Sequence, residues 1–193
     1  GYTYYVAPEI EYFYFRDEKN TDFLDSSEYF DQITPNPGTD LRRETVLTLE
    51  ELGIPVESSH HEAAPSQHEI DLRHTDALTM ADTVMTYKLV VKEIASSHGY
   101  FASFMPKPAP GINGNGMHTH MSLSNGDDNM FYGEKDTHRL SKTGRQFCAG
   151  LLKHAREITL VTNQWVNSYK RLVPSYEAPT YITWAEVNRS DLI

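Results

Sequence analysis

Hydrophobic residues cluster or alternate in several segments that predict β-strands. Residues 3–15 are rich in Tyr, Phe, Val and Ile, which are typical of a strand that is buried on at least one face. Strands are also predicted near 54–62, at 100–105 and at 117–123. We expect a last strand from Thr180 to about Val187.

Three other segments have the periodicity of helices. The first is predicted to begin at Asp40, as its N-cap, and to run to about Leu52. The clearest helix spans 76–98 and starts at Asp76. A third begins after Ser141, and its inward-facing residues are Phe147, Leu151, Leu152, Ala155 and Ile158. Strands and helices that alternate with turns favour an α+β or α/β fold.

The composition is that of a globular protein with an excess of negative charge. The 193 residues fit one large domain or two small ones, with 39% hydrophobic and 23% charged residues. No apolar run is long enough for a membrane helix. A net charge of −10 argues against nucleic acid or an anionic membrane as the main partner, and it permits a site that collects cations. The single cysteine, Cys148, excludes an internal disulfide and favours a cytoplasmic location.

Two acidic motifs suggest a metal site. Glu9 and Glu11 share one face of the first predicted strand, because side chains two residues apart point the same way. The segment 57–69 holds three glutamates and three histidines. It lacks the His-Glu-x-x-His spacing of zinc proteases, and carboxylates from several segments suit Mg²⁺ or Mn²⁺. The alternatives are a solvated strand face and a polar loop with surface histidines.

A glycine-rich loop precedes the strand predicted at 117–123. The loop, 111–116, lacks both the Walker A pattern and the Gly-x-Gly-x-x-Gly pattern. The strand after it carries His118, His120 and Ser122 on one face, which is typical of a binding site. The alternative is a hairpin loop with a solvated outer strand.

A fourth motif lies near the end of the chain, at 167–179. It contains Arg171, whose guanidinium can bind a carboxylate or phosphate through two hydrogen bonds. Glu177 lies between two prolines, which indicates an irregular loop. The alternative is an exposed basic loop.

In this order, the four motifs resemble glutamine synthetase in its bacterial and archaeal type I form. The residues that carry the resemblance are Pro8-Glu9-Ile10-Glu11, His60-His61-Glu62, Gln67-His68-Glu69, Asn113-Gly114-Asn115-Gly116-Met117-His118-Thr119-His120-Met121-Ser122, Asn167-Ser168-Tyr169-Lys170-Arg171-Leu172, Tyr176-Glu177-Ala178-Pro179 and Asn188-Arg189-Ser190. The resemblance covers almost the whole chain. The sequence departs from the family pattern at Ser66 and Ser175, where the family usually has Gly, and at Asn115, where it often has Ser.

The resemblance implies an α+β fold, with a curved antiparallel sheet and flanking helices. It further implies that residues 1–193 are the central part of the catalytic domain, truncated at both ends, without the N-terminal β-grasp domain and the C-terminal part. We therefore expect this fragment to be inactive alone. The longer protein is expected to be a cytoplasmic homododecamer.

The resemblance also implies an activity and a set of site residues. The reaction is the ATP-dependent ligation of ammonia to the γ-carboxylate of L-glutamate through γ-glutamyl phosphate, with two or more Mg²⁺ or Mn²⁺ ions per site. The expected metal ligands are Glu11, Glu62 and Glu69 for one ion, and Glu9 and His118 for the other. The residues expected at the substrates are Asn113, Gly114, Arg171 and Glu177 for glutamate, and Glu57, His120, Ser122 and Arg189 for ATP; Glu177, Arg171 and Arg189 are the expected catalytic residues.

Two other functions compete with this hypothesis. The first is a γ-glutamyl ligase that uses a polyamine or another amine, because these motifs do not identify the amine. The second is a non-catalytic relative, which would not need to keep its metal carboxylates. This chain has all the metal-binding carboxylates that a sequence of its length could carry.

Overall fold

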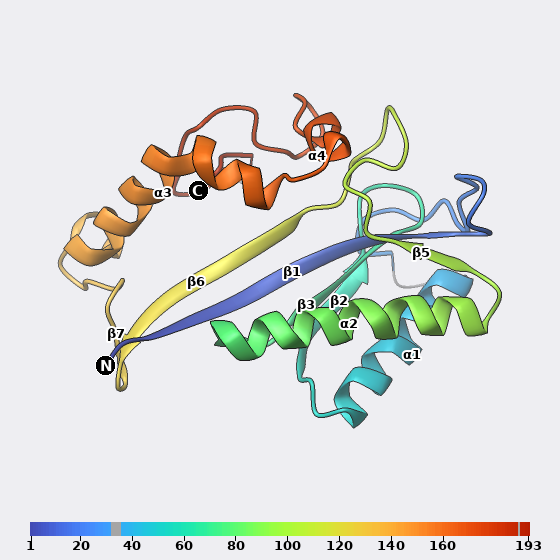
Figure 1. Ribbon diagram of the computed structural model, residues 1–193, viewed down its shortest axis with the longest axis horizontal. Helices are drawn as coiled ribbons and strands as arrows, with labels where there is room; N and C mark the ends of the chain where they lie inside the picture. The colour runs from blue at the N-terminus through green and yellow to red at the C-terminus, as the bar shows by residue number, and fades with distance from the viewer. Residues whose placement is uncertain (32–35, 189) are drawn as a thin grey trace. The chain divides into compact units, whose positions relative to one another are not determined.

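The computed structural model describes residues 1–31, 36–188 and 190–193. Its strands are β1 (Thr3–Phe15), β2 (Val56–His61), β3 (Gln67–Leu72), β4 (Thr75–Asp76), β5 (Phe101–Ser103), β6 (Met117–Asn125) and β7 (Asp128–Asn129). Its helices are α1 (Pro37–Glu51), α2 (Ala77–Ser97), α3 (Lys142–Thr162) and α4 (Val166–Arg171), with a short 3₁₀ helix η1 (Thr137–Arg139) (Figure 1). None of these helices combines the length and the apolar character needed to cross a membrane.

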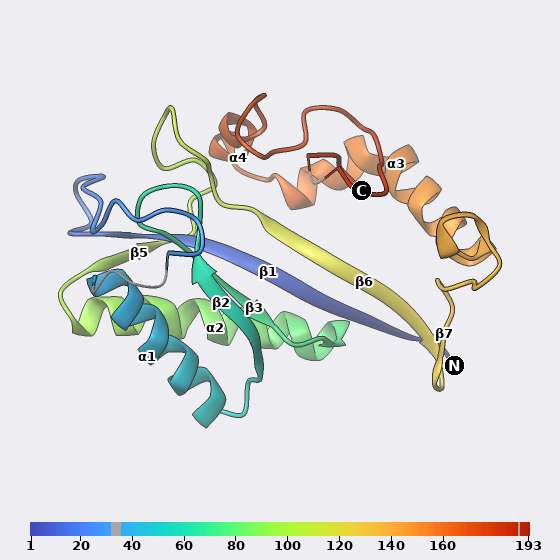
Figure 2. The same ribbon diagram turned by 180° about the vertical axis from the view of Figure 1, so that it is seen from behind.

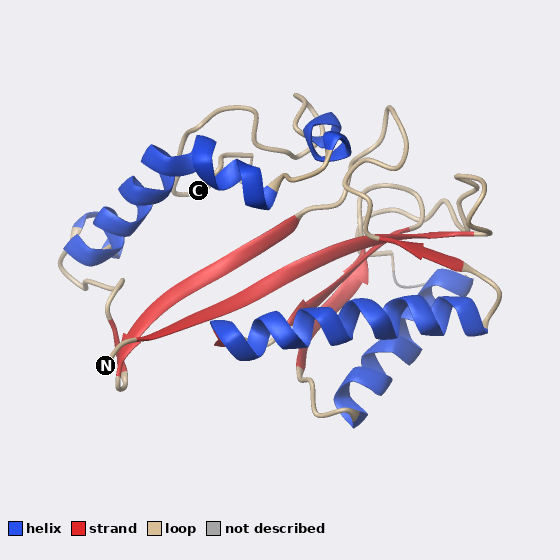
Figure 3. Ribbon diagram, viewed as in Figure 1, coloured by secondary structure: helices blue, strands red, loops and turns tan. Residues whose placement is uncertain are grey.

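Within the described residues, the strands belong to one sheet. Its order is β2-β3-β1-β6-β7, and β4 and β5 also pair with β1 (Figure 3). The pairs β1–β3, β1–β5, β2–β3 and β6–β7 are all antiparallel. The expected α+β class, with an antiparallel sheet and flanking helices, is therefore confirmed.

The chain divides into two compact units. The central unit is Val6–His120, and the terminal unit combines Gly1–Tyr5 with Met121–Ile193. The central unit contains the sheet strands β2 to β5, most of β1 and the helices α1 and α2. The first residues of β6, Met117–His120, also belong to the central unit. The terminal unit contains the rest of β6, with β7 and the helices α3 and α4.

One face of β1 forms the core of the central unit. Ile10, Tyr12 and Tyr14 alternate along the strand and are buried in one cluster with residues of α1 and α2. The Tyr87 hydroxyl, on α2, donates a hydrogen bond to the Ile10 carbonyl at 3.2 Å. Figures 1 and 2 show both helices lying beside the strands of this unit. Burial of each large side chain stabilises the fold by about 1.5–3 kcal/mol.

The opposite face of β1 is divided along its length. Phe13 and Phe15 are buried in a smaller apolar cluster with Ala64, Phe23 and Ile112. Glu9 and Glu11, earlier in the strand, point to the same side as these two aromatic residues because they lie at alternate positions. The apolar cluster therefore ends where the acidic side chains begin.

In the terminal unit, the third predicted helix is confirmed. Ser141 is the N-cap of α3, and its hydroxyl accepts a hydrogen bond from the Gly144 amide at 3.1 Å. Of the residues expected to face inward, Ala155 is buried and the other four are half-buried. One of them, Phe147, contacts the ring of Tyr4, with 6.0 Å between the ring centroids.

The structure corrects three predictions of secondary structure. The N-cap of α1 is Asn36, whose side chain accepts from the Thr39 amide at 2.7 Å, and Asp40 lies in the first turn. The strand β3 and the helix α4 were not predicted. No strand forms from Thr180 to Val187, all of which are described residues. The predicted N-cap of α2, Asp76, is confirmed.

We predict that Gly38→Ala destabilises the protein. A β-carbon at Gly38, in the first turn of α1, would lie 2.5 Å from His68 Nε2 and 2.9 Å from Asp25 Oδ2. Such overpacking costs about 1–3 kcal/mol, which exceeds the gain of about 1 kcal/mol from replacing a helical glycine. Urea unfolding of the full-length protein measures the difference.

Gly150→Ala is the matched control. This glycine lies within α3, and a β-carbon there would meet no atom within 4 Å. The control should be neutral or stabilising by up to about 1 kcal/mol. Equal stability changes for the two variants would contradict the close packing around Gly38.

Candidate active site

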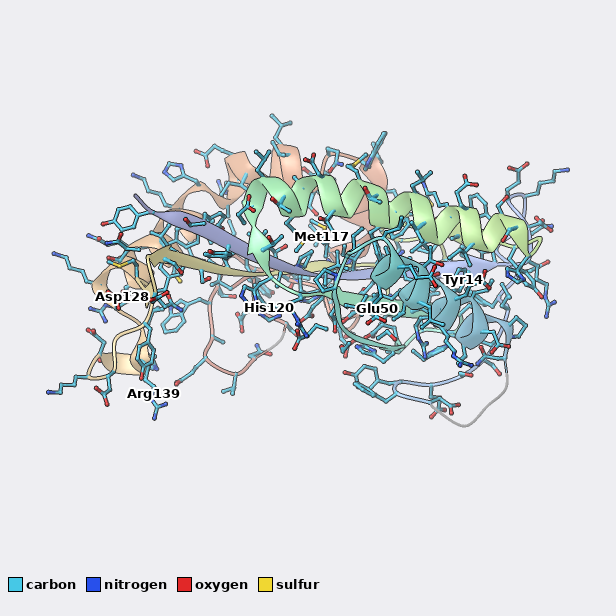
Figure 4. The ribbon with its side chains drawn as sticks, turned by 90° about the horizontal axis from the view of Figure 1, so that it is seen from below. Tyr14, Glu50, Met117, His120, Asp128 and Arg139 are labelled. Atoms are coloured by element: carbon cyan, nitrogen blue, oxygen red, sulfur yellow. The ribbon has the colours of Figure 1, made fainter. Side chains whose placement is uncertain are left out.

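The register of three strands gathers acidic residues on one face of the central unit. In β1 and β3, Glu9 lies opposite Asp71, and Glu11 lies opposite Glu69. In β2, His60 lies opposite Glu69. This is the sheet face that α1 and α2 do not cover, and Figure 4 shows α2 on one side of the sheet and His120 on the other.

The tightest group on this face is His60, Glu62 and Glu69. His60 Nδ1 lies 3.3 Å from Glu62 Oε1, and its Nε2 lies 3.3 Å from Glu69 Oε1. One ligand atom from each residue lies within 4.8 Å of the others, which is the spacing of a possible metal site. Glu62 and Glu69 were predicted as metal ligands from the sequence. His60 was not, and its position follows only from the pairing of β2 with β3.

Glu11 is held by the glycine-rich loop and by β3. Its Oε2 accepts hydrogen bonds from the Gly116 amide at 2.6 Å and from Gln67 Nε2 at 3.1 Å. His118 Nε2, on β6, lies 3.9 Å from Glu11 Oε1. Gln67 also donates to the Gly114 carbonyl at 3.1 Å, so it joins the loop to the carboxylate. Sequence reasoning missed Gln67, whose amide gives no signal by itself.

Glu9 pairs with a histidine predicted to contact ATP. His120 Nε2 lies 2.5 Å from Glu9 Oε1. Asn113, in the loop before β6, is half-buried in the same unit. Glu57, on β2, is exposed and pairs with Arg73, whose Nε lies 3.3 Å from its carboxylate.

The other predicted site residues belong to the terminal unit. Ser122 lies on β6, and Arg171 is the last residue of α4; both are half-buried. Glu177 is exposed and lines a pocket of this unit with Ser175, Ala178 and Asn188. Arg189 lies outside the described residues.

The predicted irregular loop around Glu177 is confirmed, and its backbone is unusual. Ser175 has a φ of 72° and Glu177 a φ of 50°. Ser66, in the turn between β2 and β3, has a φ of 58°. This left-handed region favours glycine, and both serines stand where the family usually has glycine. Both serines therefore hold a backbone conformation that is strained for a residue with a β-carbon.

Two aromatic residues near His60 were also missed. The Phe30 ring stacks on the His60 ring, with 4.5 Å between centroids, and the Tyr29 ring lies edge-on to it at 5.6 Å. The two residues precede His60 by about a quarter of the length of the central unit, and nothing in the spacing of the sequence predicts this contact. They cover one side of the imidazole beside the acidic group.

The electrostatics of the site favour a cation. Burial raises the pKa of the Glu69 carboxyl to about 8; nearby Asp71 and Glu11 also raise it, whereas the hydrogen bond from His60 lowers it. Burial alone would lower the pKa of His60, but its contact with Glu69 raises it. Glu69 and His60 therefore share a retained proton, because the negative charges of Asp71 and Glu11 beside them are not balanced by a cation. Carboxylate and imidazole ligands without a thiolate fit Mg²⁺ or Mn²⁺, so the residues suit a divalent metal.

Comparisons with known proteins agree on one family. Residues 1–193 match the family model described as "Glutamine synthetase, catalytic domain". The chain is 51% identical to the glutamine synthetase of Thermotoga maritima and 50% identical to that of Methanosarcina mazei, and all of it is covered in both. It spans 45% and 44% of these relatives, which is less than half their length.

A solved structure shares the fold. The cryo-EM structure of Plasmodium falciparum glutamine synthetase matches with a TM-score of 0.84 and 32% identity. The match covers 92% of this chain and 41% of that one. The architecture described above is therefore found within a longer protein.

We predict that Glu69 makes the stability of the metal-free protein pH-dependent. The folded-state pKa of about 8 exceeds the ordinary value of 4.5, so the folded protein binds more protons than the unfolded chain between these values. The free energy of unfolding should therefore fall as the pH rises through this window. Urea unfolding in EDTA at several pH values measures it.

Glu69→Gln should flatten that dependence, because the amide resembles the protonated carboxyl. Glu93→Gln, an exposed change on α2, is the control and should leave the slope as it is. A slope that Glu69→Gln leaves unaltered would show that other groups cause it.

Proposed function

The chain belongs to the family of glutamine synthetase catalytic domains, and from this we propose that its full-length protein ligates ammonia to L-glutamate at the expense of ATP. The products are L-glutamine, ADP and phosphate, and the intermediate is γ-glutamyl phosphate. The observation that carries the proposal is the acidic face of the central unit, where strands β1, β2 and β3 bring Glu11, Glu62 and Glu69 to one side of the sheet.

We propose two divalent metal ions, Mg²⁺ or Mn²⁺, at this face. Glu11, Glu62 and Glu69 would hold one ion, and Glu9 and His118 would hold the other. The 3.9 Å contact of His118 with Glu11 and the raised pKa of Glu69 support an arrangement in which the two ligand sets adjoin. When bound, the ions would supply positive charge that offsets the charge of ATP and of the transferred phosphoryl group.

The substrates are assigned to the remaining motif residues. Asn113 and Gly114 would contact glutamate, and Glu57, His120, Ser122 and Arg189 would contact ATP. The short contact of His120 with Glu9 supports a nucleotide site that borders the metal ligands. The exposed pair that Glu57 makes with Arg73 would have to open or rearrange for Glu57 to reach a nucleotide.

Three residues would act on the reacting groups. Arg171 and Arg189 would bind the anionic carboxylate and phosphoryl oxygens, because a guanidinium can donate two hydrogen bonds to such a group. Ammonia attacks the γ-carbonyl carbon, the bond to phosphate breaks, and Glu177 would accept a proton from the attacking amine. The exposed position of Glu177 in a loop supports a further role in excluding water from the intermediate.

The wider setting follows from the family. We propose that the full-length protein is a homododecamer and that it is cytoplasmic. The single cysteine supports a reducing compartment and says nothing about assembly. An N-terminal β-grasp domain and a further C-terminal part stay predictions, as does the inactivity of residues 1–193 alone. The identity of the amine as ammonia is tested by comparing ammonia with polyamines in the same assay.

We predict that Glu62→Ala and Glu69→Ala each abolish glutamine formation by the full-length protein. Each removes a carboxylate from the proposed metal shell, so Mn²⁺ or Mg²⁺ should no longer support turnover. Steady-state assays at saturating metal measure the loss. Glu51→Ala, at the exposed end of α1, is the control. Near wild-type turnover in either site variant would refute the assignment.

Arg171→Lys separates charge from geometry. Lysine keeps the charge but lacks the planar fork of arginine. A charge-assisted contact contributes about 1.5–3 kcal/mol, so its loss in the transition state should lower kcat/KM for glutamate about 10- to 150-fold. Arg156→Lys, an exposed change on α3, should have little effect. A well-folded Arg171→Lys enzyme with unchanged kcat/KM would remove Arg171 from the site.

A further inference from the structure

Behind the acidic face, on the side of the sheet that α1 and α2 cover, lies a second group of polar residues. Asp25, His61 and His68 form this group, and both histidines are buried, with 1% and 0% of their surface exposed. His61 Nε2 lies 2.8 Å from Asp25 Oδ1, and His68 Nε2 lies 3.6 Å from the other carboxylate oxygen. None of the three was assigned a role above, and Asp25 lies outside the motifs.

Asp25 connects to a metal-ligand residue through His61. Burial opposes ionisation of Asp25, but the hydrogen bond with His61 and the nearby His68 ring hold its pKa well below the usual range, so its oxygens act as acceptors. The other nitrogen of His61, Nδ1, lies 2.7 Å from the Glu62 carbonyl oxygen, which also can only accept. The His61 ring therefore lies between these two acceptors and links the carboxylate of Asp25 to the backbone of Glu62.

Asp25 also holds the turn between β2 and β3. The Ser66 amide donates to Asp25 Oδ1 at 3.1 Å, and the Asp25 amide donates to the Ser66 hydroxyl at 2.8 Å. Ser66 is fully buried and has the left-handed backbone described above. Because Glu62 precedes this turn and Glu69 follows it, contacts to Ser66 and His61 constrain both carboxylates from behind.

The group does not have the chemistry of a third metal site, although its spacing would allow one. Arg42 NH1 lies 2.7 Å from His68 Nδ1, and a guanidinium can only donate. The neutral ring therefore carries its proton on Nε2, the nitrogen that faces Asp25. A metal ion needs that nitrogen free, and the Arg42 cation beside it would repel the ion.

We propose that Asp25 is a positioning residue, which through His61 and Ser66 sets the placement of the Glu62 and Glu69 carboxylates for a divalent cation. The inference rests on the metal site of the proposed function and adds a residue outside the family motifs that were used to assign it. Partners that orient metal ligands in this way typically change metal affinity about 10- to 100-fold when they are replaced.

Mn²⁺ alone is the probe, titrated into the metal-free full-length protein and followed by the electron paramagnetic resonance signal of the free ion. Asp25→Asn keeps the shape of the side chain and removes its charge. It should weaken Mn²⁺ binding about 10- to 100-fold. It should also raise the Mn²⁺ concentration for half-maximal activity more than it lowers kcat at saturating Mn²⁺.

Asp17→Asn is the matched control. The Asp17 carboxylate also accepts two backbone hydrogen bonds, from Lys19 and Asn20, but in an exposed turn. Its replacement should leave Mn²⁺ affinity unchanged. If Asp25→Asn does not fold, the same titration is made with Ser66→Ala, which removes only the hydroxyl contact to Asp25. This variant should also weaken Mn²⁺ binding.

The outcomes separate this inference from the proposed function. A wild-type protein that binds no Mn²⁺ overturns both. A wild-type protein that binds Mn²⁺ and an Asp25→Asn protein that binds it equally well, even with a lower melting temperature, overturn the positioning role alone. A loss of Mn²⁺ affinity in Asp25→Asn or Ser66→Ala, with Asp17→Asn unchanged, supports it.

Discussion

The register between β1 and β3 decides which side of the sheet each carboxylate occupies. A shift of β1 by one residue would turn Glu9 and Glu11 toward α1 and α2 and would expose Ile10 and Tyr12 on the other side. The apolar core therefore secures the register, since burying carboxylates in place of aromatic rings is strongly unfavourable. In this sense the packing of two helices against one face of the sheet determines the chemistry available on the other.

The carboxylates of the acidic face repel one another, and the fold compensates Glu11 and Glu69 in different ways. Glu11 is partly compensated by the Gly116 amide and by Gln67, whereas Glu69 relies on His60 and on protonation. These two solutions differ in kind: a backbone amide stabilises negative charge permanently, but a proton can be exchanged for a metal ion. A cation could therefore take the place of the proton at Glu69, whereas the position of the Glu11 carboxylate is fixed by its hydrogen bonds.

Local signals in the sequence predicted much of the fold, and long-range pairing explains most of what they missed. The alternation of side chains placed Glu9 and Glu11 on one face of β1. The capping residues Asp76 and Ser141 located the starts of α2 and α3. The start of α1 was misplaced because Asn36 and Asp40 are both good N-caps. The roles of His60, Gln67 and Asp25 depend on which strands pair and which loops cross behind them, and no residue spacing encodes that.

The central position of β1 has a consequence for how the protein is made. This strand is synthesised before β3 and β6, and Glu11 lies 105 residues ahead of the Gly116 amide that it accepts from. The aromatic end of β1, from Tyr12 to Phe15, pairs with β3 and β5, and at about 5–20 residues per second it waits several seconds for β5. Until β3 is made both edges of this apolar segment are unpaired, and until β5 is made one edge still is, which favours aggregation. The interval between the synthesis of β1 and that of β5 is therefore the one in which this segment is most exposed to aggregation.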